Sequence, residues 1–218
     1  MSRSRPAEGG GRWVEVAPER LDRWLEGFAA RHGGAYAAAA EAGGVVLTAA
    51  DGAVARAEPP FPPLAGEGTD PVADLRAHAS RDRTVGVLLV RLGGFAAGVF
   101  DGGKLVASKV DSRPVHGRSA AGGWSQQRFQ RRRDGQAAVA LRAAADTAVR
   151  VLLPRAADLD AVVLGGDRRA VDGLRDDRRL APLFALAVDR FLDVPDPKRA
   201  VLEAAPDRYR AVLFHLTD

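Results

Sequence analysis

The feature that most constrains the fold is a series of three apolar runs joined by short connections that contain glycine. The runs are residues 85–91, 95–100 and 104–110, and the connections carry Gly93-Gly94 and Asp101-Gly102-Gly103. Short connections of this kind join neighbouring antiparallel strands, because glycine adopts the backbone conformations that tight turns need. The sequence therefore predicts an antiparallel meander.

A long helical pattern follows the meander, over about residues 125–153, and Gly135 either kinks this helix or marks the point where it begins. Its apolar residues form one stripe at helical spacing: Ala137, Ala140, Leu141, Ala144, Ala148, Val151 and Leu152. The compact apolar run 159–164 ends at Gly165-Gly166 and is typical of a buried strand reached by a parallel crossover. The order of these segments favours an α/β fold, with a mixed β-sheet that combines the meander with a βαβ unit and is flanked by helices.

The rest of the C-terminal region contains shorter patterns. Residues 168–176 and 198–205 predict short helices, and residues 187–192 predict a strand between them. Asp167 is interpreted as a helix cap after a strand, in preference to part of a phosphate-binding turn. The final apolar run, 211–216, fits either a helix end or an edge strand.

The N-terminal part is predicted to be a small α/β appendage, residues 1–63, with a disordered start. Leu21, Trp24, Leu25 and Phe28 lie at helical spacing, and Asp51-Gly52 separates two strand-like runs in a hairpin pattern. Four prolines, the last of them Pro63, then form a stiff linker. The expected domains are therefore 1–63 and 64–218.

Composition narrows the class of protein. The apolar content of 46% is sufficient for a globular core, and the absence of cysteine excludes disulfides and thiolate chemistry. No apolar run approaches the 18 or so residues of a membrane span. We expect a cytoplasmic protein with no membrane partner.

Positive charge is concentrated in one segment. Residues 113–150 contain eight arginines, no lysine and two aspartates, a net charge of +6, whereas the whole chain carries +4. A cationic segment of this kind is the expected footprint of a nucleic-acid contact. An arginine-rich, solvated helix face would give the same pattern, and charge alone does not separate the two interpretations.

The segment Pro114–Gln136 is the candidate functional loop. Gly117, Gly122 and Gly123 give the backbone freedom, and small residues surround them. Five arginines supply forked donors that suit phosphate groups: Arg118, Arg128, Arg131, Arg132 and Arg133. Such a loop fits two uses, which are to hold a phosphate backbone or to enter a confined site.

This loop resembles a known family. His116-Gly117-Arg118, then Gly122 to Phe129 (GGWSQQRF) and an arginine-rich helix, resemble the middle domain of the eukaryotic and archaeal class I peptide-chain release factor. The flanking FDGGKLV and AVVLGG agree in order, so the resemblance spans about 83–205. That family has Gly-Gly-Gln, whereas here Trp124 takes the glutamine's place. Gly123-Trp124-Ser125-Gln126 is instead similar to the loop of the Vms-type release-factor homologues of ribosome quality control, in an actinobacterial-like form.

The resemblance implies a release-factor middle-domain, RNase H-like fold and a codon-independent peptidyl-tRNA hydrolase that frees nascent chains from stalled large ribosomal subunits. Its partners would be large-subunit rRNA and peptidyl-tRNA, with no metal or cofactor. The sequence leaves the oligomeric state open, and we expect a monomer. The implied catalytic residues are Gln126, Gly122, Gly123 and Ser125. The implied substrate and RNA contacts are His116, Arg118, Trp124, Gln127, Arg128, Arg131, Arg132 and Arg133.

Two other functions stay open on the residues alone. A nuclease acting on tRNA or rRNA would use Asp111, His116 or Arg118. A non-catalytic ribosome-binding module would use the same arginines without chemistry. Gln126 is also an ordinary polar residue for a helix start, and Trp124 also suits an anchor that docks the loop on its own domain.

Overall fold

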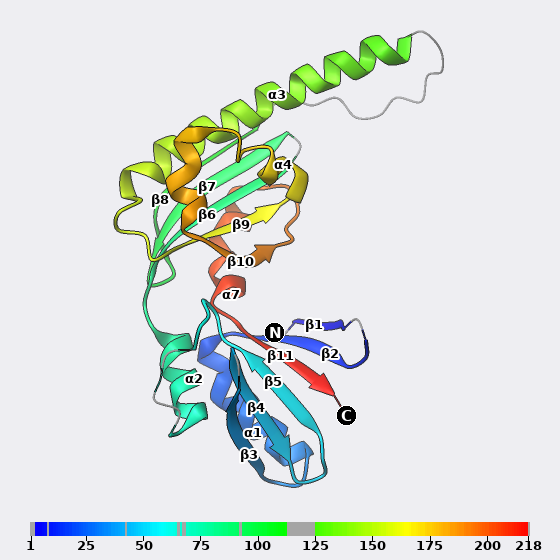
Figure 1. The fold of residues 1–218 in the computed structure, drawn as a ribbon, viewed down its shortest axis with the longest axis vertical. Coiled ribbons are helices and arrows are strands. Elements are labelled where there is room, and N and C mark those ends of the chain that lie inside the picture. The colour runs from blue at the N-terminus through cyan, green and yellow to red at the C-terminus, as the bar shows by residue number, and fades with distance from the viewer. Residues whose placement is uncertain are drawn as a thin grey trace. The chain divides into compact units, whose positions relative to one another are not determined.

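The computed structural model describes residues 3–7, 9–41, 43–64, 66, 69–91, 93–112 and 125–217, and for residues 125–134 it describes the helical backbone. The chain forms two compact units (Figure 1). Unit 1 comprises Met1–Arg81 and Pro206–Asp218, and unit 2 comprises Asp82–Ala205. The division therefore differs from the expected one at residue 63, because the proline segment and the helix after it belong to unit 1 and the chain returns there at its C-terminal end.

Unit 1 contains a six-stranded sheet in the order β1-β2-β11-β5-β4-β3, in which every neighbouring pair is antiparallel. Its strands are β1 (Arg3–Pro6), β2 (Arg12–Val16), β3 (Tyr36–Glu41), β4 (Gly44–Ala49), β5 (Val54–Glu58) and β11 (Val212–Thr217). Its helices are η1 (Pro18–Arg20), α1 (Leu21–Arg31), α2 (Pro71–Ser80) and α7 (Pro206–Tyr209).

Three features of unit 1 differ from expectation. Residues 3–6 form strand β1, where disorder was expected, because they pair with β2. The C-terminal run is neither a helix end nor an edge strand, because β11 lies between β2 and β5 and bonds to both. Strand β3 was not predicted from its alanine-rich sequence, and it forms by pairing with β4.

The core of unit 1 lies between this sheet and its helices. Leu21, Leu25 and Phe28 of α1 are buried, as their helical spacing predicts. Strand β11 contributes Val212, Phe214 and Leu216, which alternate with partly exposed residues and so line a single face. Figure 1 shows α1 and α2 on the same side of the strands.

Local signals determine where α2 begins and where the predicted hairpin turns. Asp70 caps α2 by accepting hydrogen bonds from the N–H groups of Val72 (3.1 Å) and Ala73 (3.0 Å). Pro71 occupies the first helical position, where its missing N–H costs no helical hydrogen bond. The β4–β5 hairpin turns at Asp51-Gly52, and Gly52 has a φ of 94°, a conformation that favours glycine.

Unit 2 contains a five-stranded sheet in the order β10-β9-β6-β7-β8. Its strands are β6 (Thr84–Arg91), β7 (Gly94–Asp101), β8 (Lys104–Ser112), β9 (Ala161–Gly166) and β10 (Ala187–Leu192). Pairs β6–β7 and β7–β8 are antiparallel, whereas β9 is parallel to both β6 and β10. The predicted α/β class, with a mixed sheet built from a meander and a βαβ unit, is confirmed.

Helices connect and cover these strands. They are α3 (Ser125–Val151), η2 (Leu153–Arg155), α4 (Arg168–Asp172), η3 (Arg178–Leu180), α5 (Ala181–Ala185) and α6 (Arg199–Glu203). The alanine stripe of α3 packs on the sheet, with Ala144 and Ala148 completely buried in one cluster with Leu88 and Val99. Small side chains on α3 let the helix lie close to the strands, so its C-terminal half is firmly anchored.

The opposite face of the sheet is packed as tightly. A Cβ atom at Gly98 of β7 would lie 3.0 Å from Leu105 Cδ1 and 3.1 Å from Leu202 Cδ2 of α6. Both distances are shorter than ordinary carbon contacts, which are about 3.5–4.0 Å. A side chain at Gly98 would therefore push α6 away from β7.

Candidate functional site

The site predicted from the sequence begins where β8 ends and finishes on α3. Strand β8 ends at Ser112 and α3 begins at Ser125. His116, Arg118, Gly122, Gly123 and Trp124 lie between them, outside the described residues. The part of the site that the structure does describe is therefore its frame, which is the end of β8 and the whole of helix α3.

Helix α3 carries the other predicted site residues. Ser125, Gln126 and Gln127 lie in its first turn, so the predicted helix start is confirmed, and the helix continues without interruption through Gly135. Its 27 residues span about 40 Å at 1.5 Å per residue. Arg128, Arg131, Arg132 and Arg133 follow within the next two turns.

The C-terminal half of α3 is packed in the core. Along the part of α3 whose side chains the structure describes, the first buried residue is Ala140, and Val139 beside it is 61% exposed. The preceding segment, residues 125–139, extends beyond the sheet in Figure 1 and is here called the α3 arm. At 1.5 Å per residue, Gln126 lies about 20 Å along the helix axis from Ala140. The frame thus places the first turn of α3 far from the core that anchors the helix.

The anchored half of α3 is also tied to its neighbour by ion pairs. Arg179 of η3 donates to Asp146 of α3 (2.9 Å) and to Asp177 (2.6 Å). The hydrogen bonds that Arg179 donates to Asp177 and then to Asp146 raise the pKa of Arg179 above its ordinary value, so this guanidinium is charged at neutral pH. The groups are largely solvent-exposed, so the pairs orient α3 more than they stabilise it.

Charge is distributed unequally between the units. Unit 2 contains 21 basic and 15 acidic residues, a net charge of +6, whereas unit 1 contains 11 and 13, a net charge of −2. Helix α3 alone holds six arginines and two aspartates. Arg142 and Arg150 are exposed, and no carboxylate within the described part of the chain pairs with either. The basic character therefore belongs to the unit that carries the predicted site.

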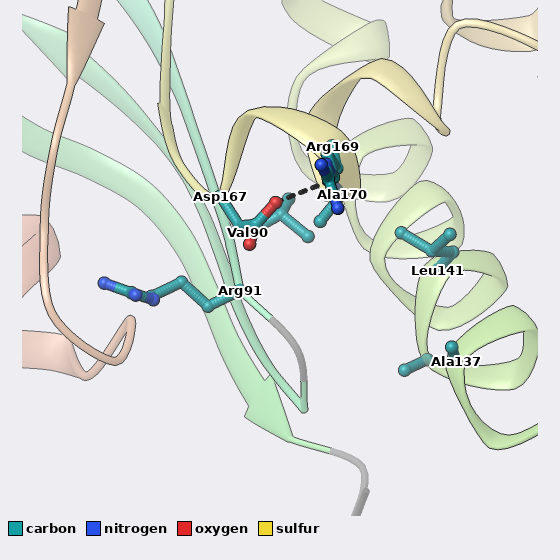
Figure 2. A pocket seen from close by; sticks show the side chains of 8 residues that line it. Val90, Arg91, Ala137, Leu141, Asp167, Arg169 and Ala170 are labelled. Atoms are coloured by element: carbon teal, nitrogen blue, oxygen red, sulfur yellow. Dashed lines mark hydrogen bonds between the residues drawn. The ribbon is translucent and has the colours of Figure 1, made fainter. Parts of the chain in front are cut away.

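A pocket of about 260 Å³ lies beside the anchored half of α3 (Figure 2). Its walls come from the end of β6, the start of α4 and α3: Val90, Arg91, Ala137, Ala140, Leu141, Asp167, Arg169 and Ala170. Asp167 accepts the Ala170 N–H (3.1 Å), which confirms its interpretation as a helix cap, and Arg91 donates to the Val194 carbonyl (2.6 Å). None of the predicted site residues lines this pocket.

Of the residues named for nuclease chemistry, the structure describes Asp111 alone. Asp111 lies on β8 and accepts the N–H of Ser112 at 2.8 Å, while His116 and Arg118 lie outside the described residues. Within the residues the structure describes, no group of three or more His, Asp or Glu side chains is placed to hold a metal ion. Over the same residues, no helix is both long and apolar enough to cross a membrane.

The solved structures similar to this chain include a translation termination factor and a termination-like factor. An archaeal translation termination factor, aRF1, is 17% identical over 72% of this chain and 47% of its own, with a TM-score of 0.43. Dom34 from S. cerevisiae, a translation termination-like factor involved in RNA quality control, is 7% identical over 92% of this chain and 65% of its own, with a TM-score of 0.34. Pelota from Archaeoglobus fulgidus is 13% identical over 93% of this chain and 63% of its own, with a TM-score of 0.30. The chain thus spans less than two thirds of each relative's length, and no curated protein sequence matches it.

A family model gives the decisive comparison. The model of the Actinobacteria/chloroflexi VLRF1 release factor matches residues 83–215, which is more than half of the chain. The match covers nearly all of unit 2, including both ends of the predicted loop, and continues into β11. It agrees with the resemblance carried by the loop motif, and the chain belongs to the Actinobacteria/chloroflexi VLRF1 release factor family.

Proposed function

We propose that this protein hydrolyses the ester bond of peptidyl-tRNA on stalled large ribosomal subunits, without reading a codon. The family match over residues 83–215 is the observation that carries the proposal. The frame supports it, because the Gly-Trp-Ser-Gln motif ends in the first turn of an arm that extends from a firmly packed core. A residue there reaches a confined catalytic centre while the body of the protein stays outside.

In this proposal Gln126 orients the water that attacks the ester carbonyl. A neutral amide both donates and accepts hydrogen bonds, so it positions water without needing a shifted pKa. The first N–H groups of an α-helix have no acceptor within the helix. The Gln126 N–H is therefore available to stabilise the negative charge that develops on the carbonyl oxygen.

The neighbouring residues assist this geometry. Gly122 and Gly123 let the backbone approach the substrate closely, and Ser125 is the first residue of the helix that carries Gln126. Gln127 lies one position further along α3, which is about 100° around the helix axis. One of the two glutamines therefore faces the ester, and we assign that role to Gln126.

The arginines of the α3 arm bind large-subunit rRNA in this proposal. Each guanidinium that neutralises a phosphate releases condensed counterions, which gives affinity and makes it salt-dependent. The charge of unit 2 supports this, because +6 is confined to the unit that would enter the ribosome. His116, Arg118 and Trp124 contact RNA beside the ester, with Trp124 stacking on an exposed base.

One assay separates this function from its alternatives. Large ribosomal subunits that carry labelled peptidyl-tRNA are incubated with the protein, and both RNA and peptide are analysed. Intact deacylated tRNA with free peptide is the expected product. Shortened tRNA would show a nuclease, and binding without any product would show a non-catalytic module; either result overturns the proposal.

A further inference from the structure

The two sheets have four edge strands in the described structure, and three of them carry features that block the addition of another strand. Strand β1 is four residues long and ends in Pro6. Strand β8 carries Lys104 and Lys109 and has a register shift against β7, and β10 has a register shift against β9. Short length, proline, lysine and bulges are the usual devices that protect sheet edges.

Strand β3 has none of these devices. Its sequence is Tyr-Ala-Ala-Ala-Ala-Glu, and its six residues pair with β4 in one unbroken register from Tyr36 to Glu41. Ala37, Ala39 and Ala40 are exposed, and their side chains are too small to hold a second backbone away. The single charge of the strand, on Glu41, is paired with Arg56 at 2.7 Å.

The backbone of β3 presents a row of unbonded groups. The Ala50 N–H donates to the Ala35 carbonyl (3.3 Å), which fixes the alternation of this antiparallel pair. Ala35 and every second residue after it bond to β4, so Tyr36, Ala38 and Ala40 direct their N–H and C=O groups outward. No residue that the structure describes hydrogen-bonds to these outward groups.

We propose that β3 is a dimerisation edge whose occupant is β3 of a second copy of this chain. An antiparallel pair centred on Ala38 places Ala38 opposite its own copy and Tyr36 opposite Ala40. Every outward group then meets a complementary one. Glu41 lies opposite Ala35, so the two carboxylates do not oppose each other and no two large side chains collide.

The second copy is the occupant because the pairing needs an unprotected strand with small side chains. Among the described edges only β3 meets that requirement, and pairing it with itself gives a closed two-fold interface and not a filament. A six-residue strand of small side chains buries far less than the ~1,200 Å² of a stable interface. The dimer is therefore weak and reversible, and it forms at high protein concentration.

Sedimentation of the full chain from micromolar to millimolar concentration tests this proposal. Wild type should pass from monomer to dimer. Ala40→Pro removes an outward N–H without touching a bond to β4, and Ala39→Lys places two like charges at diagonal positions on one face of the pair. Both variants should stay monomeric over the whole range, while the matched control Ala39→Ser should dimerise like wild type. Circular dichroism shows that each variant is folded.

Amide exchange by NMR provides the second measurement. The amides of Ala38 and Ala40 should gain protection as concentration rises, whereas those of Ala37 and Ala39, which bond to β4, should be protected already. A wild-type monomer at every concentration would overturn the proposal, as would association that leaves the Ala38 and Ala40 amides unprotected. Peptide release at nanomolar concentration should be equal in all variants, so this test is independent of the proposed function.

Discussion

The indole of Trp24 on α1 stacks on the ring of Phe214 on β11, with 3.7 Å between the ring centroids. These residues lie in the N-terminal and C-terminal segments of unit 1, on either side of the whole of unit 2 in the sequence. Phe214 is completely buried, and Trp24 also stacks on Phe28. Unit 1 is therefore complete only when the last residues of the chain have been added to its sheet.

This contact predicts a specific stability loss. Phe214→Ala should lower the unfolding free energy of unit 1 by about 3–5 kcal/mol, because it removes a buried aromatic side chain and leaves a cavity. Leu213→Ala, on the half-exposed face of the same strand, is the control and should cost less. Urea unfolding followed by tryptophan fluorescence measures both. Equal losses in the two variants would mean that the stacked cluster is not what holds β11.

The sequence predicted those elements whose signals are local. The meander follows from apolar runs with glycine turns, and the cap at Asp167 follows from residue type and position alone. The helical pattern over residues 125–153 predicted α3, which begins at Ser125 and not at Gly135. In each case the residues that determine the element lie within a few positions of it.

The elements that sequence analysis missed depend on distant partners. Alanine is a poor strand former, and β3 is a strand because β4 pairs with it. Strand β11 is an interior strand because β2 and β5 pair with it on either side. The residues of the run itself do not indicate which strands will be its neighbours. The boundary expected at residue 63 differs from the observed one for the same reason. Helix α2 follows the proline segment in the sequence, yet it packs in the core of unit 1.

The arginines of the α3 arm should control the salt dependence of ribosome binding. Replacing Arg131, Arg132 and Arg133 by alanine should weaken large-subunit binding and reduce the slope of log K against log salt by about 2 to 3, close to one per lost phosphate contact. The matched control replaces three exposed arginines of unit 1, Arg20, Arg23 and Arg31, with the same change in charge. Cosedimentation at several salt concentrations measures both. Equal slopes in the two triple variants would show that binding follows net charge and not the α3 arm.

Asp51 should contribute an acid-sensitive part of the stability of unit 1. The N–H of Ala53 (3.0 Å) and then the His32 side chain (2.9 Å) lower the pKa of Asp51 below its usual 3.8. A depressed carboxyl pKa stabilises the fold above the unfolded value, and that contribution is lost as the pH falls through the folded value. Asp51→Asn should therefore be less stable than wild type at neutral pH, with the difference disappearing as the pH falls through the lowered pKa of Asp51 in the folded state.

Urea unfolding of wild type and Asp51→Asn across this pH range measures the effect. Asp74→Asn is a useful comparison, because Asp74 is an aspartate of the same unit that lies away from the β4–β5 turn. A gap between wild type and Asp51→Asn that stayed constant down to the lowest pH would rule out titration of Asp51 as its cause.

The sharpest test of the proposed function compares the two glutamines of the first turn of α3. Gln126→Ala should slow peptide release from stalled large subunits at least about tenfold, equivalent to roughly 1.4 kcal/mol of transition-state stabilisation. Gln127→Ala is the matched control, with the same chemistry about 100° around the helix, and should cost less. Both should bind the subunit like wild type and melt at the same temperature, because the two substitutions are identical in chemistry and only the orientation of one water is at stake. Wild-type release by Gln126→Ala together with slow release by Gln127→Ala would transfer the role to Gln127. Full activity in both variants would exclude a glutamine mechanism, and the attacking water would then have to be oriented by another group.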